Sequence, residues 1–120
     1  MQERLRAAGI ATGLMLVASL CAAQAPSKPV PTEVPVQALV DRYRCMNCHG
    51  MVHKQVGPGF AQVAERYRND AAAPVRLADR IRNGGVGEWG RVIMPRQPGM
   101  TEAESKVLAG WVLAQPSPAR

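Results

Sequence analysis

Apolar side chains recur every three or four residues in four segments of the chain, a spacing typical of helices with one buried face. The first segment predicts a helix from Val36 towards His49, and the second a helix from Phe60 that fades near Asn69. The third starts at Pro74, and the fourth follows Thr101. The residues expected to point inward are Val36, Leu39, Val40, Tyr43, Phe60, Val63, Ala64, Tyr67, Leu77, Ala78, Ile81, Val107, Leu108, Trp111 and Val112.

Local signals mark the ends of these helices. Pro35 and Pro74 suit a first helical turn, Gly84 is a stop signal, and Thr101 with Glu104 forms a capping box. Because no stretch alternates convincingly as a strand, the expected fold class is all-α. Residues 50–59 and 84–100 are predicted to be two irregular loops between the helices.

The first 25 residues have the pattern of a secretory signal. Arg4 and Arg6 precede an uncharged apolar run, and small residues follow it. The favoured cleavage site, after Ala23, makes residues 1–23 the signal and removes 23 of the 120 residues, which leaves 97. An uncleaved anchor, or a lipoprotein signal acylated at Cys21, stays open as an alternative. Residues 24–35 hold four prolines and read as an extended linker.

Composition points to a missing core component. Only 4% of the residues are aromatic, yet Gly and Pro number 11 and 10. A single small domain with so few large side chains has little apolar area to offset its folding entropy. The net charge of +6 is spread along the chain without a dense basic run, so nucleic-acid binding is not expected.

The sequence Cys45-Met46-Asn47-Cys48-His49 is the attachment signature of c-type haem. Two cysteines three positions apart on a helical turn place both sulfurs on one side, where each can form a thioether with the porphyrin. His49 leaves the same turn and can bind iron. Three other readings are weaker: a zinc site that also uses His53, a thioredoxin-like redox pair, and a Cys45–Cys48 disulfide.

From about Leu39 to Ala114 the chain resembles a class I cytochrome c of the small bacterial monohaem type. The haem signature is followed in order by residues 56–60 (Val-Gly-Pro-Gly-Phe), 80–84 (Arg-Ile-Arg-Asn-Gly), 87–90 (Gly-Glu-Trp-Gly), 93–95 (Ile-Met-Pro) and 108–112 (Leu-Ala-Gly-Trp-Val). The resemblance implies an all-α cytochrome c domain at 36–116, with 117–120 as a tail. It also implies one haem c, attached through Cys45 and Cys48.

The same resemblance assigns the ligands of the iron. It makes His49 the proximal ligand and Met94 the distal one. The sequence independently favours Met94, which lies 45 residues beyond His49 in a Gly/Pro-rich loop long enough to wrap the ring. Met100 adjoins the cap of the last helix and is expected to make a small packing contact.

Supporting roles also come from the resemblance. Pro58 would accept a hydrogen bond from the His49 ring, and Trp89 and Arg80 would reach the haem propionates; for Arg80, a plain surface cation is the alternative. Trp111 would pack near Val40. Gln97 stands where relatives often carry a shorter amide that bonds the methionine sulfur, and His53 has no assigned role.

Two axial ligands leave no open position on iron, which favours electron transfer over catalysis. The expected function is a periplasmic electron carrier without catalytic residues, a monomer or a subunit of a redox complex that docks on redox proteins through their acidic faces. Membrane association is not expected, but a membrane-anchored form facing the periplasm stays open. Two alternatives stay open: a haem subunit of a periplasmic dehydrogenase or reductase complex, and a haem sensor or enzyme with a labile methionine ligand.

Overall fold

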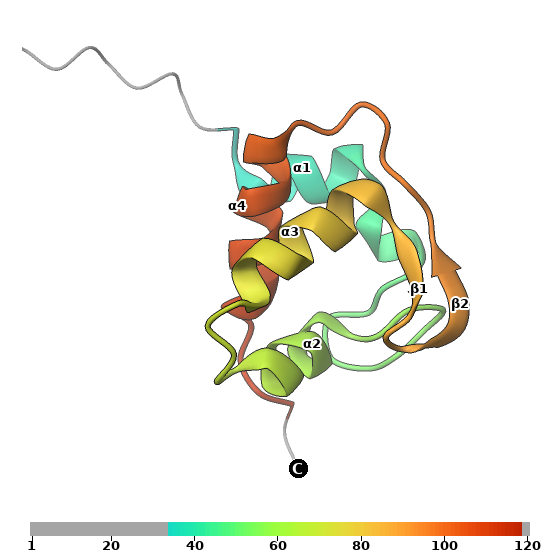
Figure 1. The fold of residues 1–120 in the computed structure, drawn as a ribbon, viewed down its shortest axis with the longest axis vertical. Helices are drawn as coiled ribbons and strands as arrows, with labels where there is room; N and C mark the ends of the chain where they lie inside the picture. The colour runs from blue at the N-terminus through green and yellow to red at the C-terminus, as the bar shows by residue number, and fades with distance from the viewer. Residues whose placement is uncertain (1–33, 119–120) are drawn as a thin grey trace, which may run out of the picture. The chain divides into compact units, whose positions relative to one another are not determined.

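The structure, a computed structural model, describes residues 34–118. The predicted signal and nearly all of the predicted linker lie outside the described residues. The fold has four α-helices, α1 (Val36–Arg42), α2 (Phe60–Tyr67), α3 (Ala73–Asn83) and α4 (Glu102–Leu113), and a short 3-10 helix, η1 (Cys45–Asn47) (Figure 1). No helix within residues 34–118 is long and apolar enough to span a membrane.

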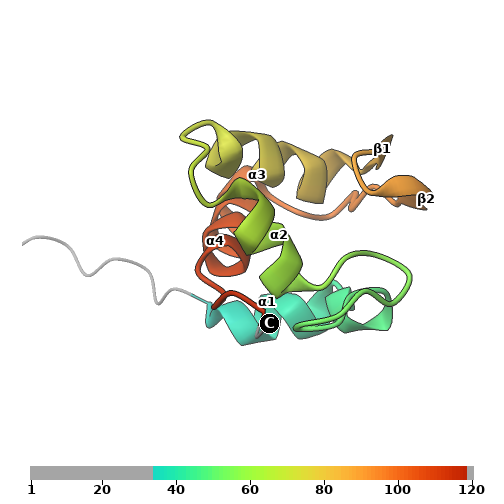
Figure 2. The ribbon, with the colours of Figure 1, turned by 90° about the horizontal axis from the view of Figure 1, so that it is seen from below.

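Helix α4 is the centre of the packing, because it contacts each of the other three helices. On one side it meets α1 in a buried cluster of Leu39, Val40, Met100 and Leu108. On the other side it meets α2 in a second cluster of Phe60, Val63 and Val112. Figure 2 shows α1 and the following loop on one side of the molecule and α3 with its hairpin on the other. The described core is thus two small clusters that share one helix.

Several sequence predictions about the helices are confirmed. Pro35 precedes α1, Pro74 lies in the first turn of α3, and Gly84 follows that helix with a φ of +72°. The Thr101–Glu104 capping box is present. Trp111 packs against the cluster that contains Val40, as expected. Val107 is the exception among the residues expected inward on α4, since 42% of its surface is exposed.

The first helix is shorter than predicted. It ends at Arg42, and the chain turns at Arg44, whose φ and ψ of 53° and 38° are left-handed, before η1 begins. The apolar periodicity cannot reveal this break, because it depends on the backbone of one polar residue. The turn separates α1 from the two cysteines, both of which line a large cavity.

Arg44→Gly is expected to raise the free energy of unfolding by about 1 kcal/mol. A residue with a Cβ atom is strained in this left-handed conformation, whereas glycine adopts it freely. Glycine also gains entropy in the unfolded chain, so the net gain stays small. Urea unfolding of the holoprotein measures the change. Arg44→Ala, which removes the same side chain but keeps the strain, should show no gain; equal stabilisation by both variants would refute the explanation.

The second predicted loop is not wholly irregular. It contains an antiparallel hairpin of β1 (Gly85–Gly87) and β2 (Gly90–Met94), in which Gly85 pairs with Met94 and Gly87 with Gly90. Gly87 and Gly90 flank the two-residue turn with φ values of +103° and +112°. Because glycines build the hairpin, it lacks the alternation by which a strand is recognised, and the all-α expectation missed it. The fold remains mainly helical.

A polar network joins α1 to the start of α4. The Glu104 carboxylate accepts hydrogen bonds from the Thr101 backbone N–H (2.9 Å), the Tyr43 hydroxyl (2.9 Å) and the Arg42 guanidinium (2.8 Å). These donors, the Thr101 backbone first, lower the pKa of Glu104 from its ordinary value of 4.5. The carboxylate is therefore favoured in the folded protein.

This lowered pKa makes part of the stability dependent on pH. A depressed carboxyl pKa stabilises the fold fully above the ordinary pKa of 4.5, and the contribution is lost as the pH falls from there through the folded-state pKa. Urea midpoints of the holoprotein should therefore fall more steeply below pH 5 than those of Glu104→Gln. Asp41→Asn is the control, because it removes an exposed carboxylate charge and leaves an amide oxygen that can still accept the long hydrogen bond from Gln37 (3.4 Å). A parent profile that matches Glu104→Gln would contradict the prediction.

Candidate functional site

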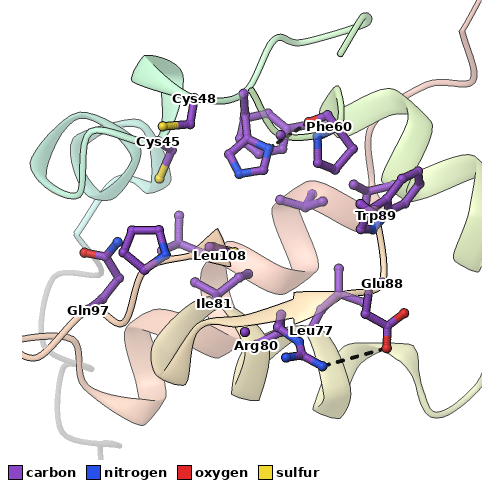
Figure 3. A pocket seen from close by; sticks show the side chains of 18 of the residues that line it. Cys45, Cys48, Phe60, Leu77, Arg80, Ile81, Glu88, Trp89, Gln97 and Leu108 are labelled. Atoms are coloured by element: carbon purple, nitrogen blue, oxygen red, sulfur yellow. Dashed lines mark hydrogen bonds and ion pairs between the residues drawn. The ribbon is translucent and has the colours of Figure 1, made fainter. Parts of the chain in front are cut away.

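One large cavity of about 760 Å³ lies between the two sides of the fold. This size is typical of pockets that hold a cofactor. Figure 3 shows Cys45 and Cys48 on one side of it and Arg80 and Glu88 on the other. The predicted site residues line this cavity. Six of them are half-buried or exposed: Cys45, Cys48, His49, Arg80, Trp89 and Met94. The seventh, Pro58, is buried and also lines the cavity.

The two cysteines come from η1 and its C-terminal end. Both are free thiols in this structure; Cys45 is half-buried and Cys48 is exposed. Burial raises the pKa of the Cys45 thiol. The backbone N–H groups of Cys48 and His49 both donate to the Cys45 carbonyl, at 3.2 and 3.1 Å. This tight turn holds the sequence 45–49 at the cavity wall.

The His49 imidazole is fixed by three contacts. Its Nδ1–H donates to the Pro58 carbonyl at 2.7 Å. Since a carbonyl only accepts, Nδ1 is the donor, and in the neutral imidazole Nε2 is therefore the nitrogen with a lone pair for a metal. The ring also stacks on Phe60, with centroids 5.1 Å apart and planes at 17°. A Cβ atom on Gly57 would lie 2.6 Å from the His49 Cε1 atom, so only glycine fits there.

The loop 50–59 supports this arrangement. Backbone hydrogen bonds join Gly57 N–H to the Cys48 carbonyl (2.8 Å) and Phe60 N–H to the Gly50 carbonyl (2.9 Å). These two bonds bring the end of the loop, at the start of α2, back to the haem signature and the residue that follows it. His53, in the same loop, is exposed. Within residues 34–118, no group of three or more His, Cys, Asp and Glu side chains is arranged to hold a metal ion.

Met94 and Met100 have different surroundings. Met94 ends β2, is half-buried and lines the cavity, as does Gln97. Met100 is 3% exposed and belongs to the core cluster with Leu39, Val40 and Leu108. Its packing is more extensive than the small contact expected from the sequence.

A group of charged and aromatic side chains surrounds Trp89. The Arg66 guanidinium lies 4.6 Å from the centre of the Trp89 ring, and the Tyr67 ring meets Trp89 edge-on at 6.5 Å. The Tyr67 hydroxyl donates to Glu88 at 2.9 Å, and Arg80 forms an ion pair with Glu88 at 3.8 Å. Sequence reasoning did not single out Glu88, although it adjoins Trp89 in the motif at 87–90.

The cavity and its lining fit a haem. Two thiols and an imidazole nitrogen stand on one wall, a thioether comes from β2, and arginines at the rim can meet carboxylates. The apolar residues Leu77 and Ile81, expected inward on α3, are half-buried because they face this cavity. The lining thus supplies apolar walls and iron ligands together.

Comparison with known proteins agrees with this geometry. The family model for cytochrome c matches residues 34–115. The chain belongs to the cytochrome c family. It is 44% identical over 78 residues to cytochrome c-552 of Hydrogenobacter thermophilus, covering 65% of this chain and 79% of that protein. It is 41% identical over 71 residues to cytochrome c-551 of Pseudomonas aeruginosa, covering 59% and 67%.

The fold is shared as well. The crystal structure of wild-type Nitrosomonas europaea cytochrome c552 matches with a TM-score of 0.63 and 33% identity, covering 66% of this chain and 98% of that one. The chain is therefore a monohaem class I c-type cytochrome with one haem c attached through Cys45 and Cys48. This c-type cytochrome is an electron-transfer protein and not an enzyme.

Proposed function

We propose that this cytochrome carries single electrons in the periplasm, between redox proteins, through an iron ligated by His49 and Met94. The observation that carries the proposal is the 2.7 Å hydrogen bond from His49 Nδ1 to the Pro58 carbonyl: in the neutral imidazole this bond puts the proton on Nδ1, so Nε2 is the nitrogen that can bind a metal at the cavity. Such a bond orients a ligating imidazole and raises its basicity.

Met94 is the methionine best suited to be the second protein ligand of the iron. Of the four methionines among residues 34–118, Met46 and Met51 are exposed near His49 and Met100 is buried in the core. Met94 lines the cavity at the end of β2, on the hairpin side of the molecule (Figure 2). A bound haem supplies a one-electron couple, and a thioether ligand raises its potential. The chain's own residues supply a rigid, apolar surrounding for that couple.

The cellular location and the partners follow from the remainder of the chain. If residues 1–23 are an export signal, the haem domain acts in the periplasm. The alternative is a chain that stays anchored to the membrane and faces the periplasm. The net charge of the full chain is +6, and removal of Glu3, Arg4 and Arg6 with the signal leaves +5. Arg44, Arg76 and Arg80 line the cavity, so a partner with an acidic docking face is favoured. Electrostatic docking of this kind weakens as salt is added.

Addition of CO to the ferrous holoprotein tests the proposal. An iron with two protein ligands should bind no CO under native conditions, and electron exchange with an acidic redox protein should slow as ionic strength rises. Rapid CO binding by the folded protein would instead indicate a sensor or enzyme with a labile ligand. Co-purification with a second polypeptide would indicate a complex subunit.

A further inference from the structure

Glu88 lies at the rim of the haem cavity and binds side chains from two helices. It occupies the first position of the turn between β1 and β2, beside Trp89, and lines the cavity. One carboxylate oxygen accepts a hydrogen bond from the Tyr67 hydroxyl of α2 at 2.9 Å. The other lies 3.8 Å from Nη2 of Arg80 in α3. The hairpin turn is thus tied to both helices through one acidic side chain.

Arg80 is held at this rim by backbone as well as by Glu88. Its Nη1 donates to the Gly84 carbonyl at 3.2 Å. Gly85 packs so closely on the guanidinium that a Cβ atom there would overlap Nη1. These contacts hold the Arg80 guanidinium at the cavity wall. There it can interact both with Glu88 and with an anionic group bound in the cavity. At 3.8 Å the Arg80–Glu88 pair is longer than a hydrogen bond, so it neutralises the carboxylate only partly.

The other arginine beside the turn does not contact this carboxylate in the same way. Arg66 donates to the backbone carbonyl of Glu88 at 2.9 Å, and its guanidinium lies over the Trp89 ring. The Glu88 side chain is 47% exposed, so water screens its negative charge in part, but the carboxylate stands at the rim of the cavity, where its charge acts on a centre bound inside. A negative charge near a redox centre stabilises the oxidised form, because reduction adds a further electron to the same region.

We propose that Glu88 is a positioning and tuning residue of the haem site: it holds Arg80 and Tyr67 at the cavity rim, and its charge lowers the reduction potential. The inference rests on the proposed function, since it requires an iron centre in this cavity. It gives a specific role to a residue that neither apolar patterning nor the haem signature identifies.

Glu88→Gln in the holoprotein is the central test, because the amide oxygen can still accept the Tyr67 hydrogen bond while the charge is lost. We expect the midpoint potential at pH 7 to rise by at least about 30 mV, which is a threefold shift of the equilibrium constant at 59 mV per tenfold for one electron. Glu88→Asp, which keeps the charge, should remain close to the parent. The matched control is Glu102→Gln at the exposed start of α4, outside the cavity lining.

A second readout is the titration of the Tyr67 phenol, followed by NMR of labelled tyrosine. Burial, and then the hydrogen bond and charge of Glu88, raise the pKa of Tyr67, whereas Arg66 and Arg76 lower it. The pKa of Tyr67 should fall in Glu88→Gln. Tyr43, which bonds Glu104 instead, should be unchanged and serves as the internal reference.

The outcomes separate this inference from the proposed function. If all variants keep the absorption spectrum of a low-spin iron but Glu88→Gln shifts the potential no more than Glu102→Gln, the role of Glu88 is refuted and the proposed function stands. Equal shifts in Glu88→Asp and Glu88→Gln would also refute it, because a packing change would then be the cause. A parent protein without a low-spin spectrum would refute the proposed function itself.

Discussion

Cys45→Ser combined with Cys48→Ser is expected to leave the chain largely unfolded when no haem is added. The described core consists of two small clusters that share α4, and both border a cavity of about 760 Å³. Residual cavity volume costs about 24 cal/mol per Å³ in protein cores. Even a third of that cost, about 6 kcal/mol over this volume, equals the whole stability of many small domains.

Far-UV circular dichroism and urea titration measure this effect. The double variant should lack the helical signal of the parent and show no cooperative transition. Met46→Ser is the matched control: it changes an exposed side chain between the two cysteines, keeps both haem-attachment thiols and should leave folding of the haem-loaded protein unchanged. A haem-free double variant with parental helicity and a cooperative transition would refute the view that haem completes this core.

Met94→Ala is expected to change the iron centre without unfolding the protein. Loss of the thioether opens a coordination position, so the ferrous protein should bind CO and lose its low-spin spectrum. The midpoint potential should fall by at least about 0.1 V, since axial ligands set haem potentials over a range of roughly 0.8 V. Absorption spectra, CO titration and potentiometry of the same sample measure these changes.

Met100 provides the contrasting variant. Because Met100 is buried in the cluster of α1 and α4, Met100→Ala should reduce the free energy of unfolding by about 2–5 kcal/mol and leave the spectrum unchanged. Met100→Leu, which conserves volume, should change neither property much. If Met100→Ala altered the iron spectrum and Met94→Ala did not, the proposed ligand would be wrong.

The sequence predicted those parts of the fold in which local pattern and tertiary contacts agree. The haem signature requires its residues at fixed spacing. Helix α2 has clear apolar periodicity, and α3 and α4 combine such periodicity with end signals at Pro74, Gly84 and Thr101. These signals act within a few residues, so they can be read without knowledge of the remaining chain.

The features of the fold and site that the sequence did not predict depend on backbone conformation or on contacts between residues distant in the chain. The left-handed Arg44 ends the first helical segment early, and positive-φ glycines build the β1–β2 hairpin without alternating side chains. Glu88 resembles any surface acid in the sequence. Its importance comes from Tyr67 and Arg80, 21 and 8 positions away, which only the folded chain brings to the same carboxylate.

Proton NMR of the ferrous holoprotein is the most direct test of the central claim, that Cys45 and Cys48 hold one haem whose iron is ligated by His49 and Met94. A methionine methyl group bound over the face of a porphyrin is shielded by the ring current. We predict one three-proton resonance far upfield of ordinary methyl signals, present in the parent and in Met100→Leu and absent from Met94→Ala. A parent spectrum without that resonance, or its persistence in Met94→Ala, would contradict the account.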